Sequence, residues 1–144
     1  MNESTVSSAF QKVFRERVPG VVLVKHADKS MIGLPDASVT HNKRTLWMEY
    51  KFIGPKTKGV YADFMRDGAW SIMDVVTASP TQYDMMCRLG RAGLSIYVFW
   101  VLNHKARKKQ VEHIVTWNPI TGETKTWASN LEVVTYVLTN FLTS

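Results

Sequence analysis

Residues 33–51 read "GLPDASVTHNKRTLWMEYK" and contain two strand-like runs on either side of the turn-forming stretch "HNKR". Side chains alternate between the two faces of a strand, so Glu49 and Lys51 share one face of the second run. The apolar side chains beside them share the opposite face. This stretch therefore predicts a hairpin that is apolar on one face and carries an acid and an amine on the other.

The turn determines which residues of the two strands face each other. A two-residue turn at Asn42-Lys43 aligns Asp36 with Glu49, and a four-residue loop keeps the same register, whereas a three-residue loop moves Asp36 away. Directly opposed side chains have Cβ atoms about 4.5–5.5 Å apart, and two like charges there are destabilising unless they are neutralised. A shared hard cation such as Mg²⁺, which prefers oxygen ligands, would neutralise this pair.

Two carboxylates with a cation and an adjacent lysine suit the hydrolysis of a phosphodiester. The cation polarises a phosphate oxygen, while the ammonium stabilises the developing charge or orients the attacking hydroxide. The alternative is a surface hairpin whose Asp, Glu and Lys form a salt-bridged face worth about 0–1 kcal/mol. Spacing alone leaves both interpretations open.

Length and composition favour one intracellular globular domain with an acidic partner. The chain has 144 residues, of which 45% are hydrophobic, enough for a core. Its 18 Lys and Arg against 12 Asp and Glu favour nucleic acid as the partner. Cys87 is the single cysteine, which excludes an internal disulfide framework and fits a reducing compartment. The apolar run at 94–102 is too short to span a bilayer and "MNESTVSS" is no signal peptide, so we expect a soluble cytoplasmic protein.

Hydrophobic periodicity predicts a mixed α/β domain over residues 1–144. The predicted elements are a helix over 3–17, strands over 21–26, 35–41 and 45–53, a helix that starts at Ser79 or Thr81 and exits through Gly90 to Gly93, a strand over 94–103, two strands within 112–127, and a final helix. Residues 54–80 are predicted to be an insertion containing a hairpin at Asp67-Gly68, with a helix as the alternative.

Residues 103–144 are predicted to contain the C-terminal hairpin and helix. Ser129 and Glu132 form a capping box for that helix. Its buried stripe is predicted to consist of Leu131, Val134, Leu138 and Phe141.

The sequence "GLPD" followed by "WMEYK" resembles the signature of the PD-(D/E)XK nucleases, in which Pro-Asp opens one strand and Glu-x-Lys lies in the next. The preceding helix and strand, Gly33 and the hairpin connection also occur where the family has them. The resemblance implies a restriction-endonuclease-like fold, a mixed central sheet flanked by helices. It also implies a Mg²⁺-dependent endonuclease, with Mn²⁺ as a substitute, whose catalytic residues include Asp36, Glu49 and Lys51.

Two further residues match positions in a narrower group that this chain resembles, the archaeal-type Holliday junction resolvases and the virus-type replication-repair nuclease (VRR-NUC) domain. These carry a Glu on the first helix, matched by Glu3, and a Gln opening a helix that ends in "L..AG", matched by Gln82. The resemblance, over residues 3–102, implies that Glu3, Asp36 and Glu49 hold the metal and that Gln82 belongs to the active site. The plainer alternatives are a helix-dipole acid for Glu3 and an ordinary polar residue for Gln82.

The resemblance also implies DNA as the partner, with cleavage of branched DNA by a homodimer in recombination or repair. The alternatives are a flap, single-strand or sequence-specific nuclease of the same fold, and an inactive nucleic-acid-binding protein. Basic residues on either side of the metal site and in the stretch "HKARKK" are expected to contact phosphates, which give affinity rather than sequence readout. These residues are Lys25, His26, Lys29, Lys56, Lys58, Arg107, Lys108 and Lys109.

Overall fold

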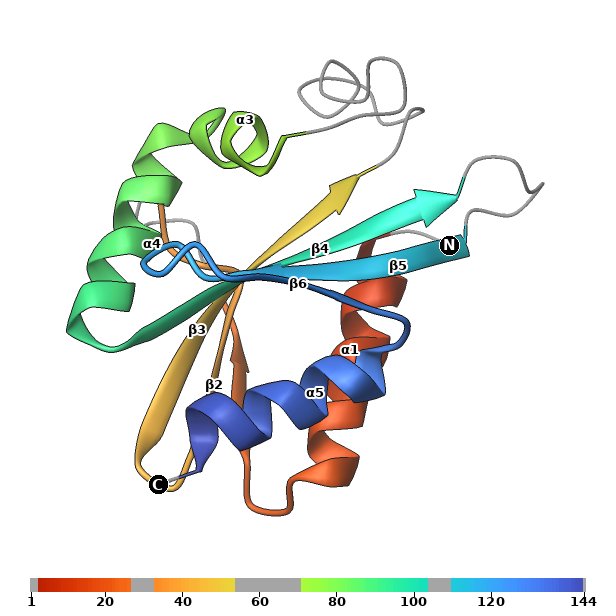
Figure 1. The fold of residues 1–144 in the computed structure, drawn as a ribbon. Coiled ribbons are helices and arrows are strands. Elements are labelled where there is room, and N and C mark those ends of the chain that lie inside the picture. Colours follow the sequence, from red (N-terminus) through yellow and green to blue (C-terminus); the bar gives the residue numbers. More distant parts are fainter. Residues whose placement is uncertain (1–2, 27–32, 54–70, 104–109, 144) are drawn as a thin grey trace.

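The computed structural model describes residues 3–26, 33–53, 71–103 and 110–143 (Figure 1), with the backbone alone for residues 3, 4, 103 and 110. The helices are α1 (Glu3–Arg17), α3 (Ile72–Thr77), α4 (Pro80–Ala92) and α5 (Asn130–Val137), which continues into the π-helical turn η2 (Leu138–Leu142). The strands are β1 (Val22–Lys25), β2 (Ala37–His41), β3 (Arg44–Ile53), β4 (Leu94–Asn103), β5 (Gln110–Trp117) and β6 (Thr124–Trp127). The predicted mixed α/β class is confirmed.

All six strands form one sheet in the order β1-β2-β3-β4-β5-β6. Neighbouring strands are antiparallel except β3 and β4, which are parallel because α3 and α4 form the connection between them. The predicted hairpin register is confirmed, since His41 pairs with Arg44 and Ala37 with Met48. The turn residues Asn42 and Lys43 have φ of 52° and 64°, as a type I′ turn requires.

Helices cover both faces of the sheet and produce two apolar cores (Figure 1). One core joins α1 and α5 to residues such as Met48 and Trp100, and the other joins α3 and α4 to residues such as Phe99. Strand β4 is buried on both faces, because its side chains enter the two cores alternately. Burial on both faces explains why residues 94–102 read as one continuous apolar run.

The C-terminal helix begins as predicted, but its buried stripe differs. The Ser129 Oγ accepts a hydrogen bond from the Glu132 N–H at 3.3 Å, and Glu132 Oε2 accepts one from the Ala128 N–H at 2.6 Å. Leu131, predicted to be buried, is 44% exposed. The helix instead packs Val133 and its neighbours against α1 and the sheet, so the prediction for Leu131 is wrong.

The predicted hairpin around Asp67-Gly68 lies largely outside the described residues. Its described end, residues 72–76, is part of α3, so the strand prediction is wrong there and the helical alternative is correct. Val75 and Val76 are buried in the core beneath α4, and this tertiary packing outweighs the β-propensity of the two valines. None of the helices in the described ranges is long and apolar enough to cross a membrane.

Candidate active site

Glu49 and Lys51 lie in the middle of the sheet, on the face covered by α4. Met48, Tyr50 and Phe52 enter the core on the α1 side, so strand alternation turns Glu49 and Lys51 the other way. Both are buried, with 3% and 6% of their surface exposed, and Lys51 Nζ lies 3.3 Å from Glu49 Oε2. The alternative of a salt-bridged surface face is therefore wrong. A buried ion pair pays a desolvation cost that a surface pair avoids.

Asp36 meets Glu49 at the point where β2 begins, as the turn register predicts. The Asp36 N–H donates to Glu49 Oε1 at 3.1 Å, and the Tyr50 N–H donates to Asp36 Oδ2 at 2.9 Å. Each carboxylate thus accepts a backbone hydrogen bond from the opposite strand. The main chain holds both carboxylates in place, which sequence reasoning did not predict.

The environment of Glu49 strongly disfavours its charged form. Burial, followed by the nearby Asp36 carboxylate, raises the pKa of Glu49 from 4.5 to about 8, while the Lys51 ammonium acts in the opposite direction. One lysine therefore does not compensate for a buried carboxylate beside a second one. A strongly perturbed pKa with a specific charge partner is typical of functional sites.

Gln82, in the first turn of α4, completes the cluster. Lys51 Nζ donates to Gln82 Oε1 at 2.7 Å, so the ammonium is held between an amide and a carboxylate. Gly33 packs against the same helical turn, because a Cβ at this position would lie 3.0 Å from the Thr81 carbonyl oxygen. Gly33 also has φ of 83°, which disfavours any other residue. The glycine of "GLPD" thus lets the segment before Asp36 approach α4 closely.

The pair Asp36 and Glu49 fits a hard divalent cation, since both offer carboxylate oxygens at one place and their mutual repulsion is relieved by positive charge. Among the residues that the structure describes, no group of three or more His, Cys, Asp or Glu converges to hold a metal. Mg²⁺ commonly keeps several waters and needs only one or two protein carboxylates. The described donor set is therefore compatible with Mg²⁺.

The proposed third ligand, Glu3, has its backbone at the start of α1, which packs against the opposite face of the sheet. Its side chain lies outside the description, so its role stays a prediction. Six of the expected DNA contacts also lie outside the described residues: Lys29, Lys56, Lys58, Arg107, Lys108 and Lys109.

Lys25 and His26 are the two expected DNA contacts that can be placed. Lys25 is exposed and pairs with Ala37, so strand alternation puts it on the α1 side of the sheet. His26 lies on the site face, with Nε2 3.1 Å from Ser38 Oγ. Its ring stacks on Trp47 at a centroid distance of 5.4 Å. Sequence reasoning missed Trp47, although its position two residues before Glu49 already put it on the same face.

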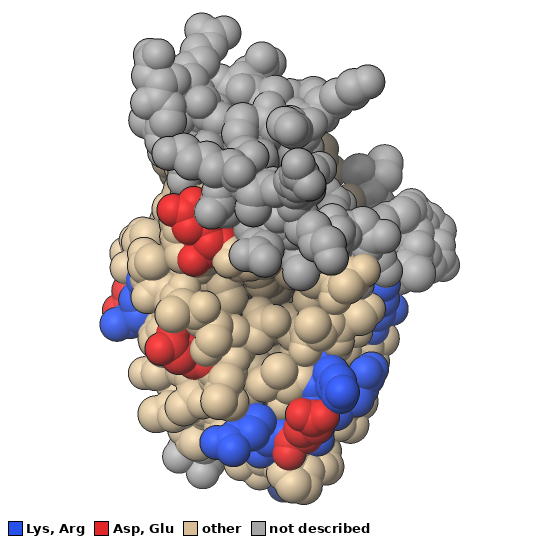
Figure 2. Space-filling model, turned by 90° about the vertical axis from the view of Figure 1, so that its right-hand side faces the viewer, with Lys and Arg blue, Asp and Glu red and all other residues tan. Residues whose placement is uncertain are grey.

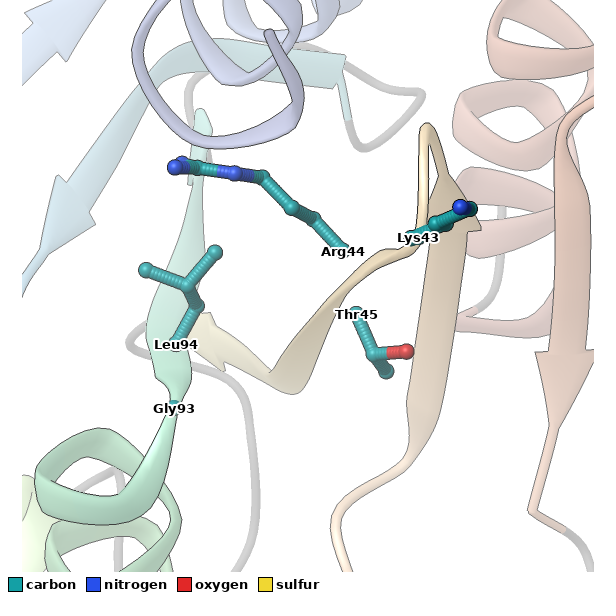
Figure 3. Close-up of a pocket in the computed structure, with 5 residues that line it drawn as sticks. All are labelled: Lys43, Arg44, Thr45, Gly93 and Leu94. Atoms are coloured by element: carbon teal, nitrogen blue, oxygen red, sulfur yellow. The ribbon is translucent and has the colours of Figure 1, made fainter. Parts of the chain in front are cut away.

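A basic hollow lies at the other end of β3. It has a volume of about 340 Å³ and is lined by Lys43, Arg44, Thr45, Gly93 and Leu94 (Figure 3). The two basic side chains point away from each other, and Arg44 Nη1 donates to the Phe141 carbonyl at 3.3 Å. On the described part of the face in Figure 2, acidic and basic side chains occur together rather than in a continuous basic patch. The cluster of Asp36, Glu49, Lys51 and Gln82 is therefore the candidate site.

The sequence was compared with protein-family models and with curated proteins. The sequence matches no protein-family model, and no curated protein shows significant similarity to it.

Proposed function

We propose that this protein is a Mg²⁺-dependent endodeoxyribonuclease of the PD-(D/E)XK type, which hydrolyses phosphodiester bonds in DNA. The observation that carries the proposal is the convergence of the buried Glu49 and Lys51 with the half-buried Asp36 on one face of the sheet. Burying charged groups in a cluster destabilises the folded protein. Phosphodiester hydrolysis is a function that requires such groups to lie together. The nuclease-like signature in the sequence supports the same conclusion.

In this proposal, Asp36 and Glu49 hold Mg²⁺, and Mn²⁺ can substitute for it; the family resemblance adds Glu3 as a third ligand. When bound, the cation supplies Lewis-acid activation of the phosphate and balances the two carboxylates. The Asp36 side chain is oriented by the Tyr50 N–H and the Glu49 side chain by the Asp36 N–H, so both acids are fixed before any ligand arrives. Side chains that are already held in place need little rearrangement when the cation and the substrate bind.

Lys51 is the proposed electrostatic catalyst. Its ammonium is held by Gln82 Oε1 at 2.7 Å and lies 3.3 Å from Glu49 Oε2. A cation fixed beside the acids can stabilise the negative charge that develops on the phosphate oxygens, or orient the attacking water. Gln82 is a positioning residue in this scheme, because it acts through Lys51.

We further propose branched DNA as the substrate and a homodimer as the active form, since symmetric cutting of two strands needs two sites. This step rests on the resemblance to junction resolvases, and flap, single-strand and sequence-specific cleavage are its alternatives. Sedimentation with and without a four-way junction tests the dimer. A monomer that binds one-to-one to a junction would contradict paired cutting.

The activity is tested by incubating the purified protein with a four-way junction, a flap, a linear duplex and a single strand. Each substrate is supplied with Mg²⁺, Mn²⁺ or EDTA. We expect cleavage with either metal, none in EDTA, and the highest rate on branched DNA. Binding without cleavage of any substrate would leave an inactive nucleic-acid-binding protein, and cleavage in EDTA would exclude the metal-dependent mechanism.

A further inference from the structure

Among the described residues, the sheet face that carries Glu49 extends beyond α4 as an open surface. Helix α4 packs against β4 and β3. On β1, at the edge of the sheet, Val22 and Val24 lie on the site face and are 58% and 44% exposed, whereas Leu23 between them packs toward the α1 core. Within the described ranges, the β1 side of this face is therefore left uncovered.

A stacked aromatic pair lies between this open surface and the acidic site. Trp47 precedes Glu49 by two residues on β3, a spacing of about 6.6–6.8 Å along a strand. The Trp47 and His26 rings are 25° from parallel. Two contacts hold His26 beside the site. Its backbone N–H donates to the Asp36 backbone carbonyl at 2.8 Å, and its ring Nε2 contacts the Ser38 hydroxyl.

The position of Trp47 is not explained by core packing. Among the described residues, neither of the two apolar cores includes Trp47. Its side chain is partly exposed, and so is that of His26. A partly exposed aromatic ring held by a stacked neighbour is a platform on which a nucleobase can stack, because every base has an aromatic face.

We propose that Trp47, supported by His26, stacks on an unpaired nucleobase of the nucleotide next to the phosphate that is cut. This inference rests on the proposed nuclease function. The occupant is a base because the platform is continuous with the site that would take its phosphate. Bases in intact duplex are stacked on one another and cannot use the platform. The substrate class is therefore DNA with an unpaired nucleotide at the cut: an opened branch point, a flap or a single strand.

The test measures binding in EDTA, where no cutting occurs. Fluorescence anisotropy gives the affinity of a labelled ten-residue oligothymidine for wild type, Trp47→Ala and Trp47→Phe. Loss of one stacked base weakens binding about 5- to 150-fold, so Trp47→Ala is expected to lose affinity by this factor. Trp47→Phe keeps a ring and is expected to retain most of the affinity, which also guards against a folding defect in Trp47→Ala.

Two controls separate stacking from general damage. Trp127→Ala removes a tryptophan on β6 that packs against Tyr136, with ring centroids 4.9 Å apart, and is expected to bind DNA like wild type. A ten-residue abasic strand keeps the phosphates and lacks the bases. Wild type should bind the abasic strand more weakly than oligothymidine, and Trp47→Ala should cause no further loss on it.

Three results would overturn the inference. They are unchanged oligothymidine binding by Trp47→Ala, equal losses on the abasic strand, and a loss that sedimentation traces to dissociation of two copies joined at this face. If cleavage of duplex DNA persists while any of these is observed, the nuclease proposal stands and the platform alone fails. If wild type neither binds nor cuts any DNA, both fail.

Discussion

The buried Glu49 carboxyl should control how the stability of the metal-free protein depends on pH. The pKa of Glu49 is raised from 4.5 to about 8, chiefly by burial and then by Asp36. The folded protein therefore keeps this proton between about pH 4.5 and 8, while the unfolded chain releases it. Because the folded state then binds more protons, its stability falls as the pH rises through this window.

The size of this loss follows from the pKa change. At about 1.36 kcal/mol per pKa unit, the rise from 4.5 to about 8 corresponds to at most about 5 kcal/mol. A typical domain is stable by about 5–15 kcal/mol, so the effect is measurable. Glu49→Gln keeps the shape of the side chain and removes the titration. The difference in unfolding free energy between wild type and Glu49→Gln should therefore shift in favour of the variant between pH 4.5 and 9.

Urea unfolding in EDTA, followed by circular dichroism at several pH values, measures this difference. Glu16→Gln is the matched control, because it makes the same substitution at an exposed position on α1, where Glu16 lies 3.8 Å from Lys12. Mg²⁺ should reduce the wild-type loss at high pH, since a bound cation favours the carboxylate. Parallel stability curves for wild type and Glu49→Gln from pH 4.5 to 9 would refute the reasoning.

Three further predictions concern Gln82, Gly33 and Lys43, each with a matched variant for comparison. Gln82→Ala removes a hydrogen-bond acceptor from Lys51 and should slow cutting about 10- to 100-fold with DNA binding unchanged. Gln82→Glu keeps an acceptor oxygen and should restore most of the rate. If Gln82→Glu cuts as slowly as Gln82→Ala, Gln82 does not act by positioning Lys51. Gly20→Ala and Gly33→Ala both place a side chain at positive φ and should each cost about 1–2 kcal/mol in urea unfolding. Gly33→Ala should lose a further ~1–3 kcal/mol of stability and also slow cutting, because its Cβ would press on the Thr81 carbonyl. Gly20 has open space around it, so Gly20→Ala should show neither of these additional effects. Equal losses of stability in the two variants would contradict the contact between Gly33 and Thr81. Lys43 has a positive φ in the hairpin turn, which glycine adopts without strain, so Lys43→Gly should raise stability by at most about 1 kcal/mol in thermal melts. Lys43→Ala keeps a Cβ at this position and should show no such gain.

Local rules were sufficient to predict the hairpin. The two-residue turn at Asn42-Lys43 and strand alternation together predicted that Asp36 faces Glu49 and that Lys51 shares the face of Glu49, and the structure confirms both. Gln82 is predicted by the family resemblance rather than by local spacing. Its contact with Lys51 depends on where α4 packs on the sheet, which spacing within the sequence does not determine.

Other features depend on contacts between distant segments. The stacking of His26 on Trp47 requires β1 to pair with β2 in one particular register, and no local signal fixes that pairing. The degree of burial of Glu49, and therefore its raised pKa, depends on how α4 covers the sheet. Likewise, the exposure of Leu131 follows from the orientation in which α5 packs, because several apolar residues of that helix could form its buried face.

The most direct test of the proposed active site is the single-turnover cleavage rate of Asp36→Asn and Lys51→Ala, measured with saturating protein, Mg²⁺ and the preferred DNA substrate. Asp74→Asn, at an exposed position on α3, is the matched control and should cut like wild type. We predict that Asp36→Asn and Lys51→Ala lose about 100-fold or more in rate while they still bind DNA. Cleavage by both variants at the wild-type rate would contradict the assignment of these residues as the active site.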